Sequence, residues 1–551
     1  MNTRAKTSAA TRAYPDMHDH IAALDEAGFL IRVDGPINKD TELHPLVRWQ
    51  FRGGMAEADR KAWLFTNIVD SKGKKYDMPV LVGATGSSPG VYSVGMGVPV
   101  EEINPHWEKA RNNPIDPVIV EDAPCQEIII EGAALDEPGN GLDGLPTPIS
   151  TPGWDNAPYL TGLGYQTRDP DTGVHNLGTY RAQVKTPRRL GINTSTESRN
   201  GGYVHWLKYK ERGEPMPAAY VIGGPPSVAY TAMCKFPEAV DEVAVAGGLV
   251  GSPINVVRCR TIDLLVPAEA EIVVEGLIDT EYLEPEAPFG ESHGHVNTQE
   301  FNGFMEVTAI TRRKDAVFMS YLSQVHPNET TGIRAIELEY GFRRHIQEHL
   351  GIKGIIKVVT HRPLTGNRKI IFVVVERGIP RTEIWRALYG VMTQLRSGGK
   401  IVFAVNDDID PHNLDSVMWA MAFRCSPHED MHILKHQDRG HGPSEMAGDE
   451  GDSALLVDAT LKQDYPPISL PKREYMERAR DIWEQMGLPA ITPEVPWFGY
   501  SLGDWPEALE QEAARAVAGD YWETGARQAQ RRRKDVAMNT DVTEVEGKET
   551  P

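Results

Sequence analysis

Two glutamates lie five residues apart in the stretch Pro285-Glu286-Ala287-Pro288-Phe289-Gly290-Glu291-Ser292-His293-Gly294. The two prolines and Gly290 favour a stiff turn, which can deliver both acids to one cavity without a helix. Because two acids in a shared site oppose each other's ionisation, one can stay protonated near neutral pH and act as a general acid while the other stays charged. An acidic, proline-rich turn is also a common surface feature, so the stretch alone leaves both interpretations open.

The composition limits the classes of protein to which the chain can belong. The chain has 551 residues, with 57 Lys and Arg against 78 Asp and Glu and a net charge of −21. Broad binding to nucleic acid or to an anionic membrane needs a basic surface, so neither is expected as a partner. No apolar run is long enough for a signal peptide or a membrane span, which predicts a cytoplasmic protein. Four scattered cysteines lack CxxC spacing, which argues against a disulfide framework and a structural zinc site.

The N-terminal part of the chain has a helix and strand pattern. Residues 1–13 are polar and are expected to form a mobile arm. Apolar residues at helical spacing predict a helix over residues 18–29, which Gly28 ends before a short strand. Residues 83–90, Gly-Ala-Thr-Gly-Ser-Ser-Pro-Gly, superficially suggest a phosphate-binding loop, but they match neither GxxxxGK[ST] nor GxGxxG and favour an irregular connection. We therefore expect an N-terminal α/β domain over residues 14–120.

The pattern then changes twice along the chain. Short Val- and Ile-rich runs separated by Gly, Pro and Asp predict a β-barrel or sandwich over residues 121–325. These runs lie at residues 127–130, 220–223, 254–257, 271–274 and 304–307. Helix and strand patterns alternate over residues 330–490, which predicts a C-terminal α/β domain. Its expected elements are helices at residues 333–350 and 383–395 and strands at residues 355–360, 370–375 and 401–405. Residues 491–551 are polar at their end and are expected to form an extension with a disordered tail.

Several blocks of the sequence together resemble one known family. The first is Val266-Pro267-Ala268-Glu269-Ala270-Glu271-Ile272-Val273-Val274-Glu275-Gly276 followed by the acid stretch. The others are Thr186-Pro187 with Gly191-Ile192-Asn193, Gly223-Gly224-Pro225-Pro226, Asp241-Glu242-Val243-Ala244-Val245-Ala246-Gly247-Gly248, and Val417-Met418-Trp419-Ala420 with Arg424-Cys425. These blocks resemble the UbiD family of prenylated-FMN-dependent decarboxylases, and the resemblance covers about residues 120–440. It implies an FMN-binding split β-barrel between an N-terminal α/β domain and a C-terminal α/β oligomerisation domain.

The resemblance implies prenylated FMN as the cofactor and a metal site beside its phosphate. The implied metal ligands are Asn193, His205 and Glu242, which would hold Mn²⁺, with K⁺ as a second cation. Carboxylate, amide and imidazole ligands suit such an ion, and the ion would neutralise the phosphate. The same three residues count as cofactor-binding. Further cofactor contacts are implied for Ser195, Pro225, Arg424 and Lys400.

The catalytic set that the resemblance implies is one arginine and two acids. The acids fall on Glu286 and Glu291, and the arginine falls on Arg199. Relatives often place this arginine five residues after the metal-ligand asparagine, whereas six residues separate Asn193 from Arg199. Arg181, Arg188 and Arg189 therefore remain as weaker alternatives. An arginine favours the charged form of a nearby acid and can hold a substrate carboxylate with two hydrogen bonds.

The implied activity is the reversible, non-oxidative decarboxylation of an aromatic or α,β-unsaturated acid, in which Glu291 protonates the carbon that loses CO₂. Ser292 stands where some relatives carry Met, which favours a polar hydroxy-, di- or heteroaromatic acid. His326 and His436 are candidate substrate contacts.

The implied partners are this small carboxylic acid, a flavin prenyltransferase as cofactor supplier, and further copies of the chain in a dimer or hexamer. Two alternatives stay open, namely an ordinary FMN oxidoreductase and a non-catalytic subunit of a carboxylase complex.

Overall fold

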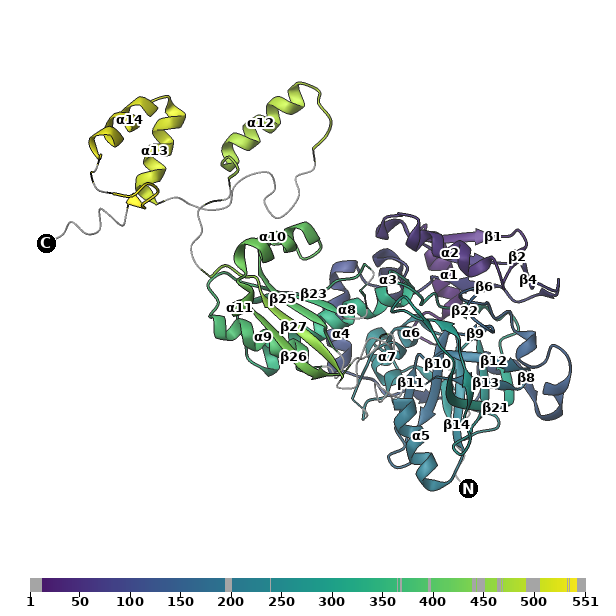
Figure 1. The fold of residues 1–551 in the computed structure, drawn as a ribbon. Coiled ribbons are helices and arrows are strands. Elements are labelled where there is room, and N and C mark those ends of the chain that lie inside the picture. Colours follow the sequence, from purple (N-terminus) through teal and green to yellow (C-terminus); the bar gives the residue numbers. More distant parts are fainter. Residues whose placement is uncertain are drawn as a thin grey trace. The chain divides into compact units, whose positions relative to one another are not determined.

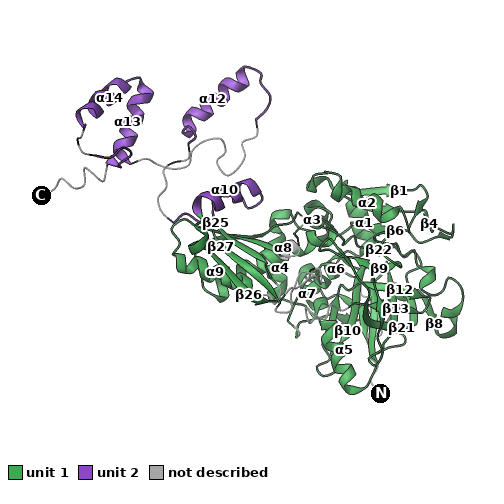
Figure 2. Ribbon diagram, viewed as in Figure 1, with its two compact units in different colours: residues 1–405, 425–459 green, residues 406–424, 460–551 purple. Residues whose placement is uncertain are grey.

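The computed structural model divides into two compact units, which Figure 2 shows in different colours. Unit 1 holds residues 1–405 and 425–459, and unit 2 holds residues 406–424 and 460–551. The structure describes residues 12–193, 201–237, 239–363, 365–366, 369–394, 398–438, 442, 451–462, 467, 469–491, 506–532, 534 and 536–542. Most of the predicted N-terminal arm therefore lies outside the described residues. Within the described part, no helix is both long and apolar enough to cross a membrane.

A four-stranded sheet with the order β1-β3-β6-β22 forms the N-terminal part of unit 1 (Figure 1). Its strands are β1 (Leu30–Val33), β3 (Ala62–Phe65), β6 (Val80–Val82) and β22 (Phe318–Ser320), and the helices are α1 (Met17–Glu26), α2 (Leu43–Arg52), α3 (Pro89–Met96) and α4 (Ile103–Asn112). A smaller sheet joins β2 (Ile37–Asn38), β4 (Ile68–Val69) and β5 (Lys75–Tyr76). Asp16 caps α1 with its side chain, and Gly28 follows the helix at φ +75°. The predicted helix and following strand are thus confirmed.

The second sheet of unit 1 has ten strands in mainly antiparallel pairing. Its main path is β11-β10-β14-β17-β21-β13-β12-β9, and β18 and β8 also pair with β21. The strands are β8 (Ile128–Glu131), β9 (Tyr159–Leu160), β10 (Leu163–Arg168), β11 (His175–Gly178), β12 (Ala182–Thr186), β13 (Arg189–Ile192), β14 (Met216–Ile222), β17 (Ile272–Ile278), β18 (Glu284–Glu286) and β21 (Glu300–Arg312). Four of the five predicted β runs lie on this sheet, and the fifth lies on β15 (Asn255–Arg258).

Three helices and a small sheet complete this region. The helices are α5 (Gly201–Arg212), α6 (Pro226–Ala232) and α7 (Glu242–Val250), and the small sheet joins β7 (Val118–Ile119), β15 and β16 (Leu265–Pro267). Helix α5 packs on β10, β11 and β14, while α7 packs on β11. The start of each helix therefore lies near β11, which matters for the site below.

The N-terminal sheet and the ten-stranded sheet share one hydrophobic core. β22 follows the ten-stranded sheet in the chain, yet it pairs in parallel with β6. One cluster of buried apolar side chains includes Met17, Trp107, Met305 and Ile333. This continuous apolar surface stabilises both parts together. The domain limits expected from the sequence stay a prediction.

The C-terminal part of unit 1 is a five-stranded sheet with its own core. Its order is β23-β24-β25-β27-β26, and α8 and α9 pack on it. The elements are α8 (Glu329–Arg344), β23 (Ile355–Thr360), β24 (Ile370–Val375), α9 (Arg381–Gln394), β25 (Ile401–Asn406), α11 (Pro427–Asp430), β26 (Met431–Gln437) and β27 (Asp452–Asp458). A separate cluster of buried apolar residues, which includes Phe342, Val373 and Leu456, fills it. The helices and strands predicted for this region are confirmed.

Unit 2 is helical within its described residues. Its helices are α10 (Leu414–Arg424), α12 (Arg473–Gln485), α13 (Glu507–Ala518) and α14 (Tyr521–Gln530). Gly519 ends α13 at φ +90°, and α14 packs against α13. Much of this segment was expected to be a disordered tail, so α14 differs from that expectation.

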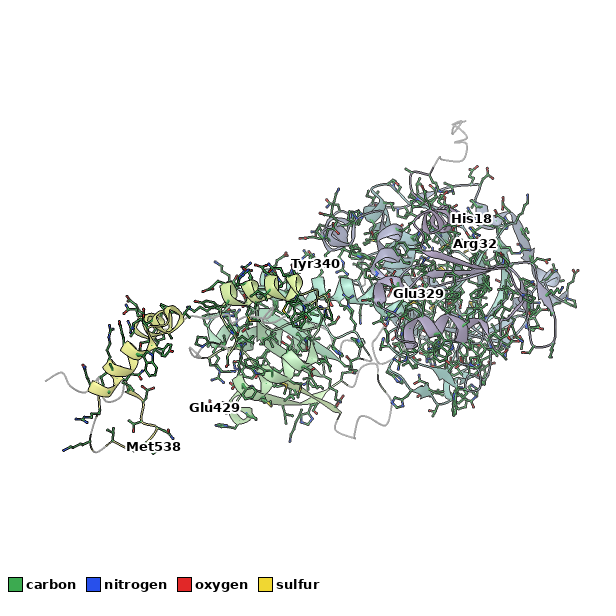
Figure 3. The ribbon with its side chains drawn as sticks, turned by 90° about the horizontal axis from the view of Figure 1, so that it is seen from above. His18, Arg32, Glu329, Tyr340, Glu429 and Met538 are labelled. Carbon is green, nitrogen blue, oxygen red and sulfur yellow. The ribbon has the colours of Figure 1, made fainter. Side chains whose placement is uncertain are left out.

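The glycine-rich loop at residues 83–88 binds a carboxylate of the chain itself. Glu329, which Figure 3 labels, is the first residue of α8 and is fully buried. Its carboxylate accepts hydrogen bonds from the backbone N–H groups of Gly83 and Thr85, each at 3.1 Å, and from the Thr85 hydroxyl at 2.9 Å. Burial raises the pKa of Glu329 to about 7, although these donors oppose the shift. The loop is an irregular connection, as predicted.

Candidate active site

The two acids of the Pro285–Gly294 stretch lie on a short hairpin at the edge of the ten-stranded sheet. Glu286 ends β18, and Glu291 directly follows β19 (Phe289–Gly290). Ala287 adopts φ +78° between them, and β19 pairs with β20 (Val296–Asn297). The backbone thus turns sharply between the acids, as the prolines and glycine predict.

One arginine contacts both acids. Arg181, which directly precedes β12, donates from Nε to Oε1 of Glu286 and from Nη2 to Oε2 of Glu286, both at 2.8 Å. Its Nη1 donates to Oε1 of Glu291. The Arg181 side chain is 10% exposed, Glu286 is 1% exposed and Glu291 is 13% exposed. A two-bond fork fixes Glu286 in a buried position, while Arg181 and Glu291 keep some access to solvent.

Aromatic side chains lie against this arginine and its acids. The Arg181 guanidinium lies 4.9 Å from the centre of the Phe289 ring, and the Phe289 and Tyr159 rings are 4.3 Å apart. Burial, together with the charge of Glu286, raises the pKa of the Tyr159 phenol. The low-polarity surroundings strengthen the interactions of the Arg181 charge with the two acids.

The loop that carries His326 lies behind Glu291. The backbone N–H of Val325 donates to the Glu291 carbonyl at 3.2 Å. His326 is buried, its Nδ1 pairs with the Thr331 hydroxyl, and its carbonyl accepts from Nη1 of Arg52 at 3.0 Å. Ser292 is buried next to Glu291. Two of the three predicted substrate residues therefore lie near the proposed proton donor.

A second polar group forms around β11, where α5 and α7 begin. Glu242 is buried and accepts a hydrogen bond from the Leu177 N–H at 2.9 Å. Burial raises its pKa to about 8, so the carboxylate is poorly stabilised by the protein alone. The Tyr180 hydroxyl accepts from the Gly202 N–H at 3.4 Å. Burial and the Glu242 charge raise the pKa of Tyr180 to about 12, whereas Gly202 and the Asn176 side chain oppose this rise. Asn176, Tyr180 and Glu242 therefore meet at the start of α5.

The structure places the other two predicted metal ligands as follows. His205 is buried on α5, and its Nδ1 pairs with the Thr167 hydroxyl at 2.9 Å. Burial lowers the pKa of His205 to about 4, which leaves a neutral imidazole. Asn193 directly follows β13. Among the described residues, no three His, Cys, Asp or Glu side chains come together as a metal site. Asn176, which the sequence analysis did not name, lies on β11 next to Leu177, whose N–H binds Glu242, and is therefore a further candidate ligand.

The remaining predicted residues are distributed over the fold. Arg199 and Ser195 lie outside the described residues. Pro225 immediately precedes α6, Lys400 pairs with Asp452 at 2.7 Å, and His436 is exposed at φ +59° on β26. Arg424 belongs to unit 2, where it binds Asp408 with two hydrogen bonds of 2.9 and 2.6 Å. Of the alternative arginines, Arg188 pairs with Asp136, and Arg189 pairs with Glu284 and Glu306.

The spacing that the family resemblance implies is also found at Arg181. Arg181 stands five residues after Asn176, which is the spacing that the family resemblance implies, whereas six residues separate Asn193 from Arg199. The residues between them, Leu177-Gly178-Thr179-Tyr180, join the Glu242 group to the acid pair. The same spacing also occurs at Asn255 and Arg260, so the spacing alone would have left two candidates, of which Arg181 is the one that contacts both acids.

Comparisons with known proteins show which family and fold the chain resembles. Residues 118–325 match the family model of the 3-octaprenyl-4-hydroxybenzoate carboxy-lyase Rift-related domain (UbiD), and residues 337–458 match the model of its C-terminal domain. A protein of Aquifex aeolicus described as uncharacterized is 27% identical over 520 residues, with 86% of this chain and 99% of that protein covered.

Two solved structures also resemble the fold. The UbiD-class enzyme HmfF from Pelotomaculum thermopropionicum, in complex with FMN, has a TM-score of 0.72 and 27% identity over 85% of this chain and 100% of its own. The closed form of vanillic acid decarboxylase from Sedimentibacter hydroxybenzoicus has a TM-score of 0.73 and 23% identity over 86% and 100% of the two chains, which bears on the fold alone.

The two family models together take in more than half of the chain, and the first contains Arg181 and both acids of the turn. The predicted combination of helix and sheet is confirmed by the match to UbiD-class structures. Sequence, fold and the acid pair therefore agree that this chain belongs to the UbiD family and is a carboxy-lyase.

Proposed function

We propose that this protein catalyses the reversible, non-oxidative decarboxylation of an aromatic or α,β-unsaturated carboxylic acid with prenylated FMN. The observation that carries the proposal is Arg181, which binds Glu286 with a fork and also contacts Glu291. A largely buried arginine shared by two acids provides both a fixed charge and a proton-carrying group in one place. Hydride transfer by an ordinary flavin does not require such an acid pair. Family membership and HmfF, whose structures contain prFMN or FMN, support the cofactor.

The residues around β11 fit a flavin phosphate held with a cation. Glu242 is a buried carboxylate for which a divalent cation would supply the missing charge. Gly201 begins the 12-residue helix α5, and a β-carbon on it would collide with the Asn176 side chain, so only glycine allows this close approach. The start of such a helix favours an anion. We therefore propose that Asn176 and Glu242 hold Mn²⁺, that K⁺ assists, and that His205 helps shape the site.

Each residue of the acid pair has a distinct role in the proposed reaction. Prenylated FMN, when bound, supplies an electrophilic carbon and accepts the electrons that CO₂ leaves behind. Arg181 orients the substrate carboxylate and holds Glu286 in place through its two-bond fork. Glu291, which is more accessible, delivers a proton to the carbon that has lost CO₂ and takes one back in carboxylation.

The surroundings of Glu291 favour a polar aromatic acid. Ser292 offers a small hydroxyl beside Glu291, and the buried His326 lies on the loop bonded to the Glu291 backbone. Such groups can bind a phenol or a second carboxylate of the substrate. Structures of decarboxylases acting on vanillic acid and 3,4-dihydroxybenzoic acid share this fold. We propose a hydroxy-, di- or heteroaromatic acid as the substrate class.

The assembly and the cofactor supply are also proposals. The C-terminal α/β sheet, with its own core, suits the role of an oligomerisation domain in a dimer or hexamer, which the mass of the particle in solution would measure. A flavin prenyltransferase would supply the cofactor.

Expression with and without a flavin prenyltransferase tests the function directly. Protein expressed with the prenyltransferase should release prenylated FMN by mass spectrometry and decarboxylate aromatic acids, whereas protein expressed without it should bind plain FMN or none and be inactive. The Glu291→Gln variant should keep its flavin and its thermal midpoint but lose turnover, together with deuterium incorporation from D₂O into the product. Turnover with ordinary FMN alone, or normal turnover and deuterium incorporation by Glu291→Gln, would overturn the proposal.

A further inference from the structure

The segment that follows the acid turn folds back along it. β18 pairs with β21, and β19 pairs with β20. Glu286 lies opposite Glu300 and Phe289 lies opposite Asn297, so both short pairings continue a single antiparallel register. Residues 296–302 therefore run in the opposite direction beside the two acids. Their side chains can reach the acid turn at regular steps.

Three amide side chains of this returning segment donate hydrogen bonds to the acid turn. Nδ2 of Asn297 donates to Oε1 of Glu291 at 3.1 Å. Nε2 of Gln299 donates to the Ala287 carbonyl at 3.2 Å, and Nδ2 of Asn302 donates to Oε2 of Glu286 at 3.4 Å. We call Asn297, Gln299 and Asn302 the amide row. The amide row thus gives one donor to each acid and one to Ala287 between them, whose carbonyl also accepts from Nδ2 of Asn156 at 2.9 Å.

The orientation of Asn297 is fixed by a second contact. Its Oδ1 lies 3.3 Å from Nε2 of His293, a ring nitrogen that can donate to it. This contact turns the amide nitrogen of Asn297 toward Glu291. Oε1 of Glu291 also receives Nη1 of Arg181. Because one arginine serves two carboxylates, a further neutral donor stabilises the charged form of Glu291 without adding a net charge.

Resting on the proposed function, we propose that the amide row positions the two acids and that Asn297 sets the pH at which Glu291 releases its proton. In this role Asn297 is a positioning residue that acts through Glu291. The charged and titratable groups around Glu291 are Arg181, Glu286, Asp155, His293 and His295. Asn297 itself is neutral, so Asn297→Asp adds one negative charge beside these groups, whereas Asn297→Ala and Asn297→Gln leave the local charge unchanged.

Substitutions of Asn297 test the inference with the titration of Glu291 as the readout. Infrared difference spectra between the chain and its Glu291→Gln variant, recorded over pH without substrate, isolate the Glu291 carboxyl band. Asn297→Asp places a like charge beside Glu291, so the midpoint should rise by about one pH unit or more. Asn297→Ala removes one donor to the charged form and should raise the midpoint less, while Asn297→Gln should restore part of the shift. The pH above which kcat falls should rise in the same variants, and KM should change less than kcat.

Thr298→Ala is the matched control, because Thr298 is exposed between two residues of the amide row. It should leave the Glu291 midpoint and turnover unchanged, and the thermal midpoint of each variant shows that the fold is kept. If Asn297→Asp and Asn297→Ala titrate Glu291 as the parent chain does, the inference is wrong while the proposed function stands. If Glu291→Gln keeps normal turnover, the proposed function fails, and the infrared midpoints still decide whether Asn297 controls Glu291.

Discussion

Arg181 and Arg313 of unit 1 each lie between two carboxylates, but the donors around them differ. Arg181 binds Glu286 and Glu291, which also receive side-chain amides. Arg313 contacts Asp16 at 2.8 Å and Glu271 at 3.3 Å. The carboxylates around Arg313 also accept backbone N–H groups, from Asp19 at 3.0 Å and from Val317 at 2.9 Å.

The comparison separates a structural ion cluster from a candidate catalytic one. All three groups of the Arg313 cluster are buried, and together they join the start of α1 to the ten-stranded sheet. Burial opposes the charged form of Asp16, but the Asp19 N–H and Arg313 outweigh it and lower the pKa of Asp16. The Arg181 cluster keeps Glu291 partly accessible and holds it with side chains, so a proton can reach it. One pattern in the sequence, an arginine and two acids, therefore serves two purposes according to its donors and its exposure.

The largest expected effect is on turnover and concerns Arg181. Arg181→Lys keeps the charge but cannot reproduce the fork to Glu286, so kcat should fall by about 10²-fold or more. The thermal midpoint should change little. Arg188→Lys, at an exposed arginine paired with Asp136, serves as the control and should be as active as the parent. An Arg181→Lys variant with near-normal kcat would remove the distinction between the two clusters.

Glu242 extends the comparison with the two arginine clusters. It is a buried carboxylate, and we propose that its partner is a metal cation and not an arginine. Glu242→Ala should lose manganese and flavin together, since the phosphate and the ion would share one site. Elemental analysis and flavin absorbance measure both losses. Asp241→Asn is a matched control, since asparagine can still cap α7 where Asp241 now accepts from Val243. Full manganese and flavin in Glu242→Ala would show that Glu242 is not the ligand.

Loss of Arg313 should affect stability instead of chemistry. Arg313→Met removes the cation that the buried Asp16 and Glu271 share and leaves them only the partly exposed Arg12 and His18, which should lower the free energy of unfolding by about 3 kcal/mol. Turnover per folded molecule should stay near that of the parent. Denaturant unfolding followed by fluorescence, with activity measured on the folded fraction, checks both statements. An unchanged midpoint would contradict the structural role of this cluster.

The smallest expected effect is a pH dependence at His18, which Figure 3 labels. Its Nε2 lies 3.1 Å from Oε2 of Glu271, and this hydrogen bond raises the pKa of His18. The stabilisation is fully present below the unfolded pKa of 6.5 and is lost as pH rises through the higher folded value. Because the side chain is partly exposed, the gain should stay below about 1 kcal/mol.

His18→Asn should therefore be less stable than the parent at pH 6 and nearly equal to it at alkaline pH. Unfolding free energies measured over this range decide the matter, with the exposed His412 substituted in the same way as control. A constant difference at every pH would mean that the charge of His18 contributes nothing.

Regular periodicity made much of the fold predictable from the sequence. The strands at residues 355–360 and 370–375 coincide with β23 and β24, because uninterrupted β-branched runs between turn residues have few alternatives. Glu286 and Glu291 were predicted as a pair because the turn between them is local. Pairing between strands far apart in the sequence was harder to predict. For example, β22 joins a sheet whose other strands lie far earlier in the chain.

The partner of the two acids depended on such long-range pairing. Arg181 and Glu286 are 105 positions apart, and the sequence alone does not reveal which of several arginines faces the turn. Asn176 was missed for a similar reason, since its proximity to Glu242 follows from the packing of α7 on β11. Helix α14 was overlooked because its segment is polar, and a polar composition does not by itself exclude a helix that packs on a neighbour.

Glu329 acts as an intramolecular ligand of the glycine-rich loop. Gly83 and Thr85 present backbone N–H groups to an anion in the manner of a phosphate loop, yet the anion is covalently attached about 245 residues later. Its effective concentration is set by the fold and not by the cell, so free phosphate or a nucleotide would have to compete with a tethered group. The loop thus acts as a non-covalent crosslink between the first sheet and the helix that begins the C-terminal part of unit 1.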